Sequence, residues 1–301
     1  MEQAVVEVTG LSRTYGDRKA LDAVSFRATP GQVYGLVGSN GAGKTTLLKH
    51  LLGLLRATSG SVRVFGLDPV RDPVGVLGRV GYLSEERDLP EWMSVGELLN
   101  YTQAYHPHWD VAYARELLGT FALDPKKKVK DLSKGMRAQA GLIAAVAHRP
   151  QLLVLDEPSS GLDAIVRRDI LDAIVRAVAD DGRTVIFSSH LLDEVERMSD
   201  HVTLMHHGRV ALSGVLDDVR RTYQRSRVHF TEHFDAAPDL DTALMMEGGG
   251  RSWSVVHCGS TEQFRHAVHA RGGEIVESRD ATLEEIFLAR AGRGRPQVEA
   301  A

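Results

Sequence analysis

The segment Gly38–Thr45, GSNGAGKT, limits the fold of this chain more than any other feature. It fits the pattern G-x-x-x-x-G-K-[ST], and it lies between an apolar run that predicts a strand, QVYGLV, and leucines at helical spacing, TTLLKHLLGLL. Glycines let successive backbone N–H groups curl around phosphate oxygens, and the first turn of a helix adds a partial positive charge. The segment therefore predicts a phosphate-binding loop inside a strand–loop–helix unit.

The pattern also assigns roles to the residues of this loop. Lys44 is expected to reach the β- and γ-phosphates of a nucleotide, and the hydroxyl of Thr45 is expected to ligate Mg²⁺. The remaining nucleotide-binding residues predicted in this segment are Gly38, Ser39, Asn40, Gly41, Ala42, Gly43 and Thr46.

A second feature is the acidic end of a fully apolar run, QLLVLDEP, at residues 151–158. Ligand sites of parallel α/β sheets lie at the carboxyl ends of the strands, which is where Asp156 and Glu157 are expected. Asp156 suits the shell of Mg²⁺, and Glu157 suits orienting or deprotonating an attacking water. The alternative is a strand that runs into a solvated acidic turn. Beside the phosphate loop, the pair indicates a Mg²⁺-dependent nucleotide hydrolase with a P-loop.

Composition limits the classes of protein to which this chain can belong. The formal net charge of −4 over 301 residues gives no excess of positive charge for binding nucleic acid, so no nucleic-acid partner is expected. A single cysteine, Cys258, and the absence of a signal-like opening favour a cytosolic protein. The longest apolar runs, such as Ala140–Ala147, are far shorter than the roughly 20 residues of a membrane helix, so no direct membrane span is expected.

Along the chain, apolar strands alternate with helical segments, which predicts an α/β fold with a mainly parallel sheet covered on both faces. After Val219 the pattern changes to short strands and two helices, with Gly248, Gly249 and Gly250 predicted to form a turn. We expect a nucleotide-binding domain at 1–219, a small α+β region at 220–290 and a disordered tail at 291–301.

Between the two phosphate motifs, LSKGM at residues 132–136 opens a helix that is predicted to run to His148. Taken alone, Ser133 would be only a helix N-cap. In this order and spacing the segment resembles the signature of ABC-type ATPases, and Ser133 with Gly135 would form an anion site at the helix start. The resemblance covers about residues 5–219 and implies a RecA-like core with a helical subdomain at about 86–150.

Other positions then match the same family. The resemblance implies that Tyr15 stacks on adenine, that Asp163 in Ser160–Asp163 belongs to a loop coupling two sites, and that His190 contacts the γ-phosphate as a catalytic residue beside Glu157 and Lys44. It implies ATP and Mg²⁺ as cofactors. It also implies a dimer, with a second copy or a relative, because the signature of one subunit closes over the nucleotide of the other.

The departures from the common signature, Lys134 and Met136, resemble the ATP-binding subunits of ABC-2-type exporters. Such a subunit binds a separate integral membrane permease, which would place it at the inner face of the cell membrane. An importer subunit and an ABC ATPase acting on ribosomes or DNA remain as alternatives. The sequence names no transported substrate.

One further departure lies in GYLSEERD, residues 81–88. Relatives of this family usually carry a glutamine where this chain has Glu85. The resemblance implies that Glu85 contacts the nucleotide and offers an oxygen to Mg²⁺, now with a negative charge. The alternative is that Glu85 only faces solvent, as its neighbour Glu86 is expected to do.

Overall fold

The computed structural model describes residues 3–179 and 182–291 of the chain. These residues form two compact units, one that ends at Val210 and one that begins at Ala211. Each unit is described by itself below. None of the described helices is long and apolar enough to cross a membrane.

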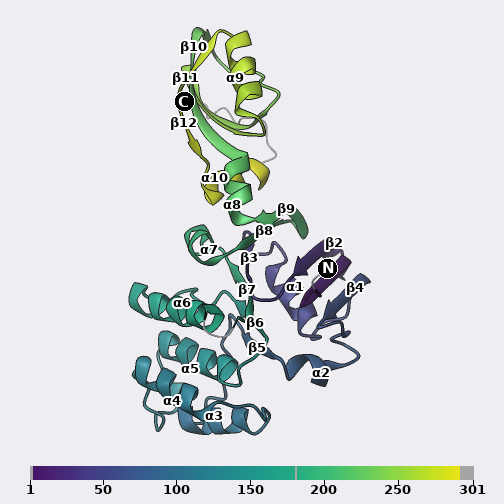
Figure 1. Ribbon diagram of the computed structural model, residues 1–301, viewed down its shortest axis with the longest axis vertical. Helices are drawn as coiled ribbons and strands as arrows, with labels where there is room; N and C mark the ends of the chain where they lie inside the picture. Colours follow the sequence, from purple (N-terminus) through teal and green to yellow (C-terminus); the bar gives the residue numbers. More distant parts are fainter. Residues whose placement is uncertain (1–2, 180–181, 292–301) are drawn as a thin grey trace. The chain divides into compact units, whose positions relative to one another are not determined.

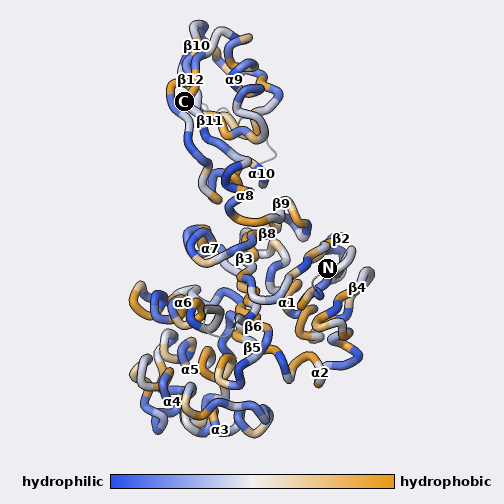
Figure 2. Tube along the Cα trace, in the orientation of Figure 1, coloured by the Kyte–Doolittle hydropathy of each residue, from blue (hydrophilic) through white to orange (hydrophobic). Residues whose placement is uncertain are grey.

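The first unit is built on a sheet with the strand order β5-β6-β7-β3-β8-β9, whose last strand, β9, continues past Val210. In this order, the strands from β5 through β8 pair in parallel, and every residue of β3 and β6 is buried. Figure 2 shows β3 and β6 as hydrophobic segments, which is what burial of both faces requires. This confirms the predicted mainly parallel sheet. Its strands are β3 (Val33–Val37), β5 (Val80–Leu83), β6 (Leu152–Asp156), β7 (Thr184–Ser189), β8 (His201–His206) and β9 (Arg209–Val215).

A separate antiparallel sheet of three strands, which the sequence did not predict, belongs to the same unit. It contains β1 (Val6–Tyr15), β2 (Arg18–Ala28) and β4 (Ser59–Val64) in the order β2-β1-β4. Helix α1 (Lys44–Leu51) contacts both β2 and β4 and also β6 of the parallel sheet. Its Leu47 and Leu48 share one core with Phe26 of β2 and Val154 of β6. This packing fixes where α1 begins, and α1 begins directly after the phosphate loop.

Helices α3, α4, α5 and α6 lie together on the side of β5 and β6 (Figure 1). Helix α5 packs on β5 and contacts α3, α4 and α6. Ser94 and Glu97 form a capping box at the start of α3, and Asp110 caps α4. The bounds of these elements are α2 (Pro73–Leu77), α3 (Val95–Gln103), α4 (Val111–Thr120), the 3₁₀ turn η1 (Val129–Asp131), α5 (Lys134–Val146), α6 (Ala164–Ala179) and α7 (Leu192–Met198).

The second unit has an antiparallel sheet with the order β11-β10-β12. Phe230, Trp253, Phe264 and Val268 form its apolar core. Helix α9 contacts β12, and α10 contacts β11. Its elements are α8 (Leu216–Thr222), β10 (Tyr223–Phe234), β11 (Ala243–Cys258), α9 (Thr261–Ala270), β12 (Gly273–Asp280) and α10 (Leu283–Ala291).

The prediction of a turn at Gly248–Gly250 is wrong, because all three glycines lie inside β11. Gly248 has a φ of 140° and Gly250 a φ of 60°. The register between β10 and β11 shifts at this place, since His229 pairs with Ser252 but Phe234 pairs with Gly250. Glycines at such positions mark an irregularity within a strand rather than its end. Apart from Ala291, which belongs to α10, the predicted tail lies outside the described residues.

Candidate functional site

The phosphate loop connects β3 to α1, as the sequence predicted. Gly43 has a φ of 106°, and a Cβ there would lie 2.7 Å from the backbone oxygen of Ala20, so only glycine fits. No side chain caps the start of α1 at Gly43. The first N–H groups of α1 are therefore left for a ligand, and a helix start with free N–H groups favours an anion.

Lys44 and Glu157 face each other beside this loop. The Nζ of Lys44 donates to the backbone oxygen of Gly38 at 2.6 Å and lies 3.1 Å from Oε1 of Glu157. Lys44 is 6% exposed and Glu157 5% exposed, so the ion pair is nearly dry. The structure thus brings the predicted phosphate-binding lysine and the predicted water-orienting glutamate into direct contact.

A serine joins the two acidic residues at the end of β6. The Oγ of Ser188 in β7 donates to Oδ1 of Asp156 at 2.6 Å and accepts from the backbone N–H of Glu157 at 2.9 Å. All three residues are buried. Asp156 pairs with Ser188 in the parallel register of the two strands, so this network follows from the sheet itself. It fixes Asp156 at the carboxyl edge, where the sequence predicted it.

His190 completes this cluster just after β7. Its Nδ1 lies 2.6 Å from Oε2 of Glu157, and its backbone N–H donates to the same oxygen at 3.4 Å. The carboxylate accepts the hydrogen bond, so Nδ1 is the protonated nitrogen in this contact. The side chain of His190 is 43% exposed, whereas that of Glu157 is 6% exposed. His190 therefore connects the buried carboxylate to the open side of the site.

Tyr15 stands at the end of β1 with an exposure of 45%. The guanidinium of Arg13 lies 4.7 Å from the centroid of its ring. On the first residue of β2, the Nη2 of Arg18 donates to the backbone oxygen of Gly41 in the phosphate loop at 3.3 Å. The hairpin of β1 and β2 therefore places an exposed aromatic ring and a cation beside the loop.

The signature residues make local contacts. Ser133 caps α5, since its Oγ accepts from the N–H of Met136 at 3.2 Å, and Ser133 itself is exposed. Gly135 is buried, and a Cβ there would lie 3.0 Å from Val166 of α6. Asp163 caps α6 by accepting from the N–H groups of Ile165 and Val166. These bonds do not reach Lys44 or Glu157 within the described part of the chain.

Glu85 lies two residues beyond the end of β5 and is exposed, as is Glu86. Because β5 pairs in parallel with β6, Glu85 lies at the same sheet edge as Asp156. Two residues on, Arg87 is buried, and burial lowers its pKa while the charge of Glu85 partly offsets this.

The sequence reading missed three residues of this site. Ser188 had a signal, because it stands at the end of the strand that leads to His190. Arg18 and Arg87 had none, since an arginine near a loop is ordinarily a solvated charge. Arg18 is in fact exposed, and the burial of Arg87 depends on distant segments.

Comparisons with known proteins agree with this geometry. A family model described as ABC transporter matches residues 21–160. The daunorubicin resistance ATP-binding protein DrrA3 of Streptomyces coeruleorubidus is 32% identical over 318 residues, spanning 100% of both chains. The bacitracin transport ATP-binding protein BcrA of Bacillus licheniformis is 28% identical over 306 residues, 96% of this chain and 98% of that one. A solved structure described as the ATP binding subunit of an ABC transporter is similar with a TM-score of 0.67 at 31% identity, covering 72% of this chain and 92% of that one. The predicted P-loop α/β fold is confirmed.

Proposed function

Because this chain belongs to the ATP-binding proteins of the ABC transporter family, we propose that it hydrolyses ATP to drive export through a separate membrane permease. The observation that carries the hydrolytic part is the contact of Glu157 with both Lys44 and His190 at the phosphate loop. The relatives named for daunorubicin resistance and bacitracin transport support the transport part.

The contacts of Lys44, Glu157 and His190 suggest a separate role for each residue in ATP hydrolysis. Lys44 neutralises charge on the β- and γ-phosphates, so the incoming phosphate replaces Glu157 as its partner. Glu157 then orients a water and takes its proton as the water oxygen attacks the γ-phosphorus and the bond to the β-phosphate oxygen breaks. His190 holds the carboxylate through Nδ1 at 2.6 Å and can approach the γ-phosphate from the open side. Tyr15 offers an exposed ring on which adenine can stack.

The oxygen donors at this edge suit Mg²⁺. The hydroxyl of Thr45, the carboxylate of Asp156 and the carboxylate of Glu85 are hard oxygen ligands, and Ser188 already orients Asp156. Among the described residues no group of three His, Cys, Asp or Glu side chains could hold a metal ion. Mg²⁺ needs no such group, because it usually combines one or two carboxylates with phosphate oxygens and water. When bound, it would neutralise charge on the phosphates.

We further propose that the complete site contains two chains. Ser133 is exposed at the start of α5, and its cap bond is to its own helix. A helix start of this kind can receive the phosphates of a nucleotide held by a second copy. Two such sites related by a two-fold axis would hold the dimer closed around ATP, and hydrolysis would allow the dimer to open.

The proposed docking site of the permease is a groove beside the residues that follow β5, from Ser84 to Asp88. Its cavity of about 620 Å³ includes Ser84 and Arg87. Val74 and Tyr105, which also line it, are 84% and 67% exposed. An apolar segment of the permease on the inner side of the membrane would cover these side chains. The chain would then work as a peripheral subunit at the inner face of the cell membrane.

We expect the permease to be encoded close to the gene of this chain, and the test is to co-express the full chain with a multi-span membrane protein found there. We expect the two to co-purify from detergent-solubilised membranes, and Tyr105→Glu to weaken this association while ATP hydrolysis by the isolated chain persists. Trp92→Glu is the matched control, because Trp92 is an aromatic residue of similar exposure, 72%, outside the groove lining. Recovery of the chain with ribosomes or DNA, and not with the membrane protein, would contradict the proposal.

A further inference from the structure

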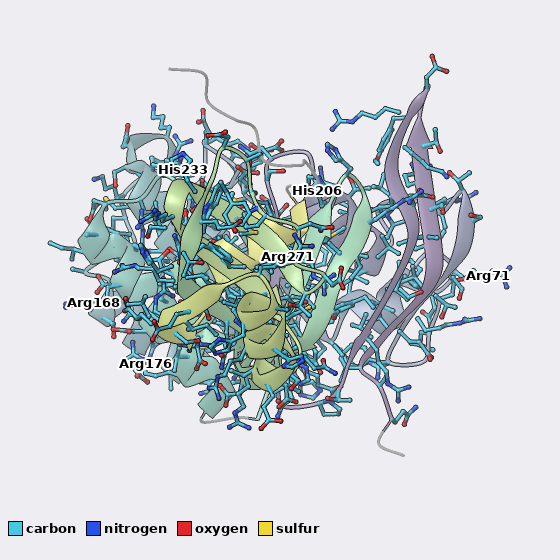
Figure 3. The ribbon with its side chains drawn as sticks, turned by 90° about the horizontal axis from the view of Figure 1, so that it is seen from above. Arg71, Arg168, Arg176, His206, His233 and Arg271 are labelled. Carbon is cyan, nitrogen blue, oxygen red and sulfur yellow. The ribbon has the colours of Figure 1, made fainter. Side chains whose placement is uncertain are left out.

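Arg87 is one of two buried arginines in the described part of the first unit, and Arg183 is the other. Arg71, Arg168 and Arg176 extend outward on exposed side chains (Figure 3), whereas Arg87 is 4% exposed. Its Nε and Nη1 atoms make no hydrogen bond within the described part of the chain. A buried cation that is only partly satisfied lowers stability, so packing alone gives no reason for an arginine here.

The hydrogen bonds that the Arg87 side chain makes both reach one loop. Its Nη2 donates to the backbone oxygen of Pro158 at 3.0 Å and to that of Ser160 at 3.1 Å. These two carbonyls flank Ser159, and Pro158 directly follows Glu157. The guanidinium thus clamps the loop that leaves β6.

Arg87 is itself held at the end of β5. Its backbone N–H donates to Oγ of Ser84 at 3.1 Å, and its φ of 53° lies in the left-handed region. A non-glycine residue keeps such a conformation only where the surroundings enforce it. The side chain therefore starts from a fixed point and connects the ends of two neighbouring parallel strands.

The clamped loop determines where the Glu157 carboxylate lies. The N–H of Ser160 donates to the backbone oxygen of Glu157 at 3.1 Å, and Oγ of Ser159 donates to Glu194 at 2.6 Å. Glu157 has a left-handed φ of 47°, so its backbone depends on such restraints. Without Arg87, two carbonyl groups of this turn lose their partner, and the carboxylate can move away from the attacking water.

We propose that Arg87 is a positioning residue for hydrolysis, which fixes Glu157 through the carbonyls of Pro158 and Ser160. Both of its side-chain hydrogen bonds go to backbone carbonyls of this turn, so the proposed role acts through Glu157. Its removal should therefore impair the chemical step and spare ATP binding, which depends on the phosphate loop and Lys44.

The experiment compares Arg87→Ala, Arg87→Lys and wild type as full chains, measuring kcat, KM, nucleotide affinity and thermal stability. For Arg87→Ala we expect a loss of about 10- to 100-fold in kcat, with KM and nucleotide Kd within about threefold. Arg87→Lys should recover part of the loss, because an ammonium group can donate to both carbonyls. The matched control is Arg79→Ala, since Arg79 also donates to a backbone carbonyl, that of Gly75 at 3.0 Å, but away from Glu157.

A double variant separates positioning from general destabilisation. In a Glu157→Gln background, Arg87→Ala should cause no further loss of kcat, because the two residues act as one unit. Folded Arg87→Ala protein with unchanged kcat, or losses that multiply in the double variant, would overturn the proposal. Should Arg87→Ala fail to fold, Arg87→Lys and Arg87→Gln carry the same comparison.

Discussion

Glu157 combines a buried carboxylate with a strained backbone. A left-handed φ of 47° at a non-glycine residue costs on the order of 1–3 kcal/mol. Lys44, His190 and the Oγ of Ser188 each contact this residue and over-determine its position. Strain that persists under so many restraints indicates that the place of the carboxylate matters more than the stability of the turn.

Replacing Glu157 with Gln tests this role. The amide keeps the size of the side chain but accepts no proton from water, so turnover should fall at least about 100-fold. ATP affinity should be kept, because Lys44 is released for phosphate, and an ATP-bound dimer should accumulate. Steady-state hydrolysis, nucleotide titration and size-exclusion chromatography with ATP measure the three effects. Turnover close to that of wild type would remove Glu157 from its proposed role.

Glu85→Gln tests the second unusual carboxylate. Two unit negative charges about 5 Å apart repel by roughly 3 kcal/mol at an effective dielectric near 20, so Glu85 should oppose the γ-phosphate when no metal is present. With Mg²⁺ between them the interaction becomes attractive. Because Glu85 is exposed, solvent weakens both effects. The variant should therefore reduce the ratio of ATP affinity with Mg²⁺ to that without it, by about tenfold at most.

Equilibrium nucleotide titration with Mg²⁺ and with a chelator measures this ratio. Glu86→Gln is the matched control, because it removes the same charge from the neighbouring exposed residue. Equal ratios in wild type and Glu85→Gln would mean that the charge of Glu85 is incidental.

At the scale of elements, α5 is tied to β5 by a buried imidazole just beyond its end. The Nε2 of His148 lies 3.3 Å from the backbone oxygen of Val80, which requires a protonated Nε2. Its ring stacks on that of His106, with centroids 3.8 Å apart. Burial, with the charge of His106 as a second cause, lowers the pKa of His148 to about 4. The neutral form of His148 therefore joins the helical part of the unit to the parallel sheet.

This predicts a pH dependence of stability. The unfolded chain binds a proton on His148 near its ordinary pKa of 6.5, whereas the folded chain does so only near 4. Stability from this group is thus complete above about pH 6.5 and falls towards pH 4, by at most about 1.4 kcal/mol per pH unit. His148→Asn should flatten the slope, and the exposed His108→Asn should not. Urea unfolding from about pH 7 to about pH 5 measures it, and equal slopes in wild type and His148→Asn would contradict the assignment.

At the scale of the whole molecule, the sequence predicted those segments whose conformation depends on neighbouring residues in the chain. The phosphate loop, the acidic end of β6 and the cap at Ser133 are of this kind, because strand, glycine and helix follow one another directly. The sheet of β2, β1 and β4 could not be predicted, since β1 pairs with residues about 50 positions away. The burial of Arg87 depends likewise on Pro158 and Ser160, 71 and 73 residues further on.

The dimer is the largest-scale prediction. If one chain supplies Lys44 and the other supplies Ser133, then Ser133→Ala should lower hydrolysis and leave the ATP affinity of the single chain unchanged. Ser94→Ala is the matched control, because Ser94 also caps a helix, α3, and its loss costs a similar amount of about 1 kcal/mol. A cap that served only stability would give the same result at both positions.

Mixing two inactive variants makes this test decisive. A dimer of one Lys44→Ala chain and one Ser133→Ala chain places both defects in the same composite site and leaves the other site intact. Random pairing yields such mixed dimers in about half of the population, so activity should return to about a quarter of the wild-type value. If each chain instead held a complete site, neither variant could repair the other, and the mixture would stay as inactive as its components. Recovered ATP hydrolysis on mixing therefore measures whether Ser133 of one copy acts on the nucleotide bound at Lys44 of another.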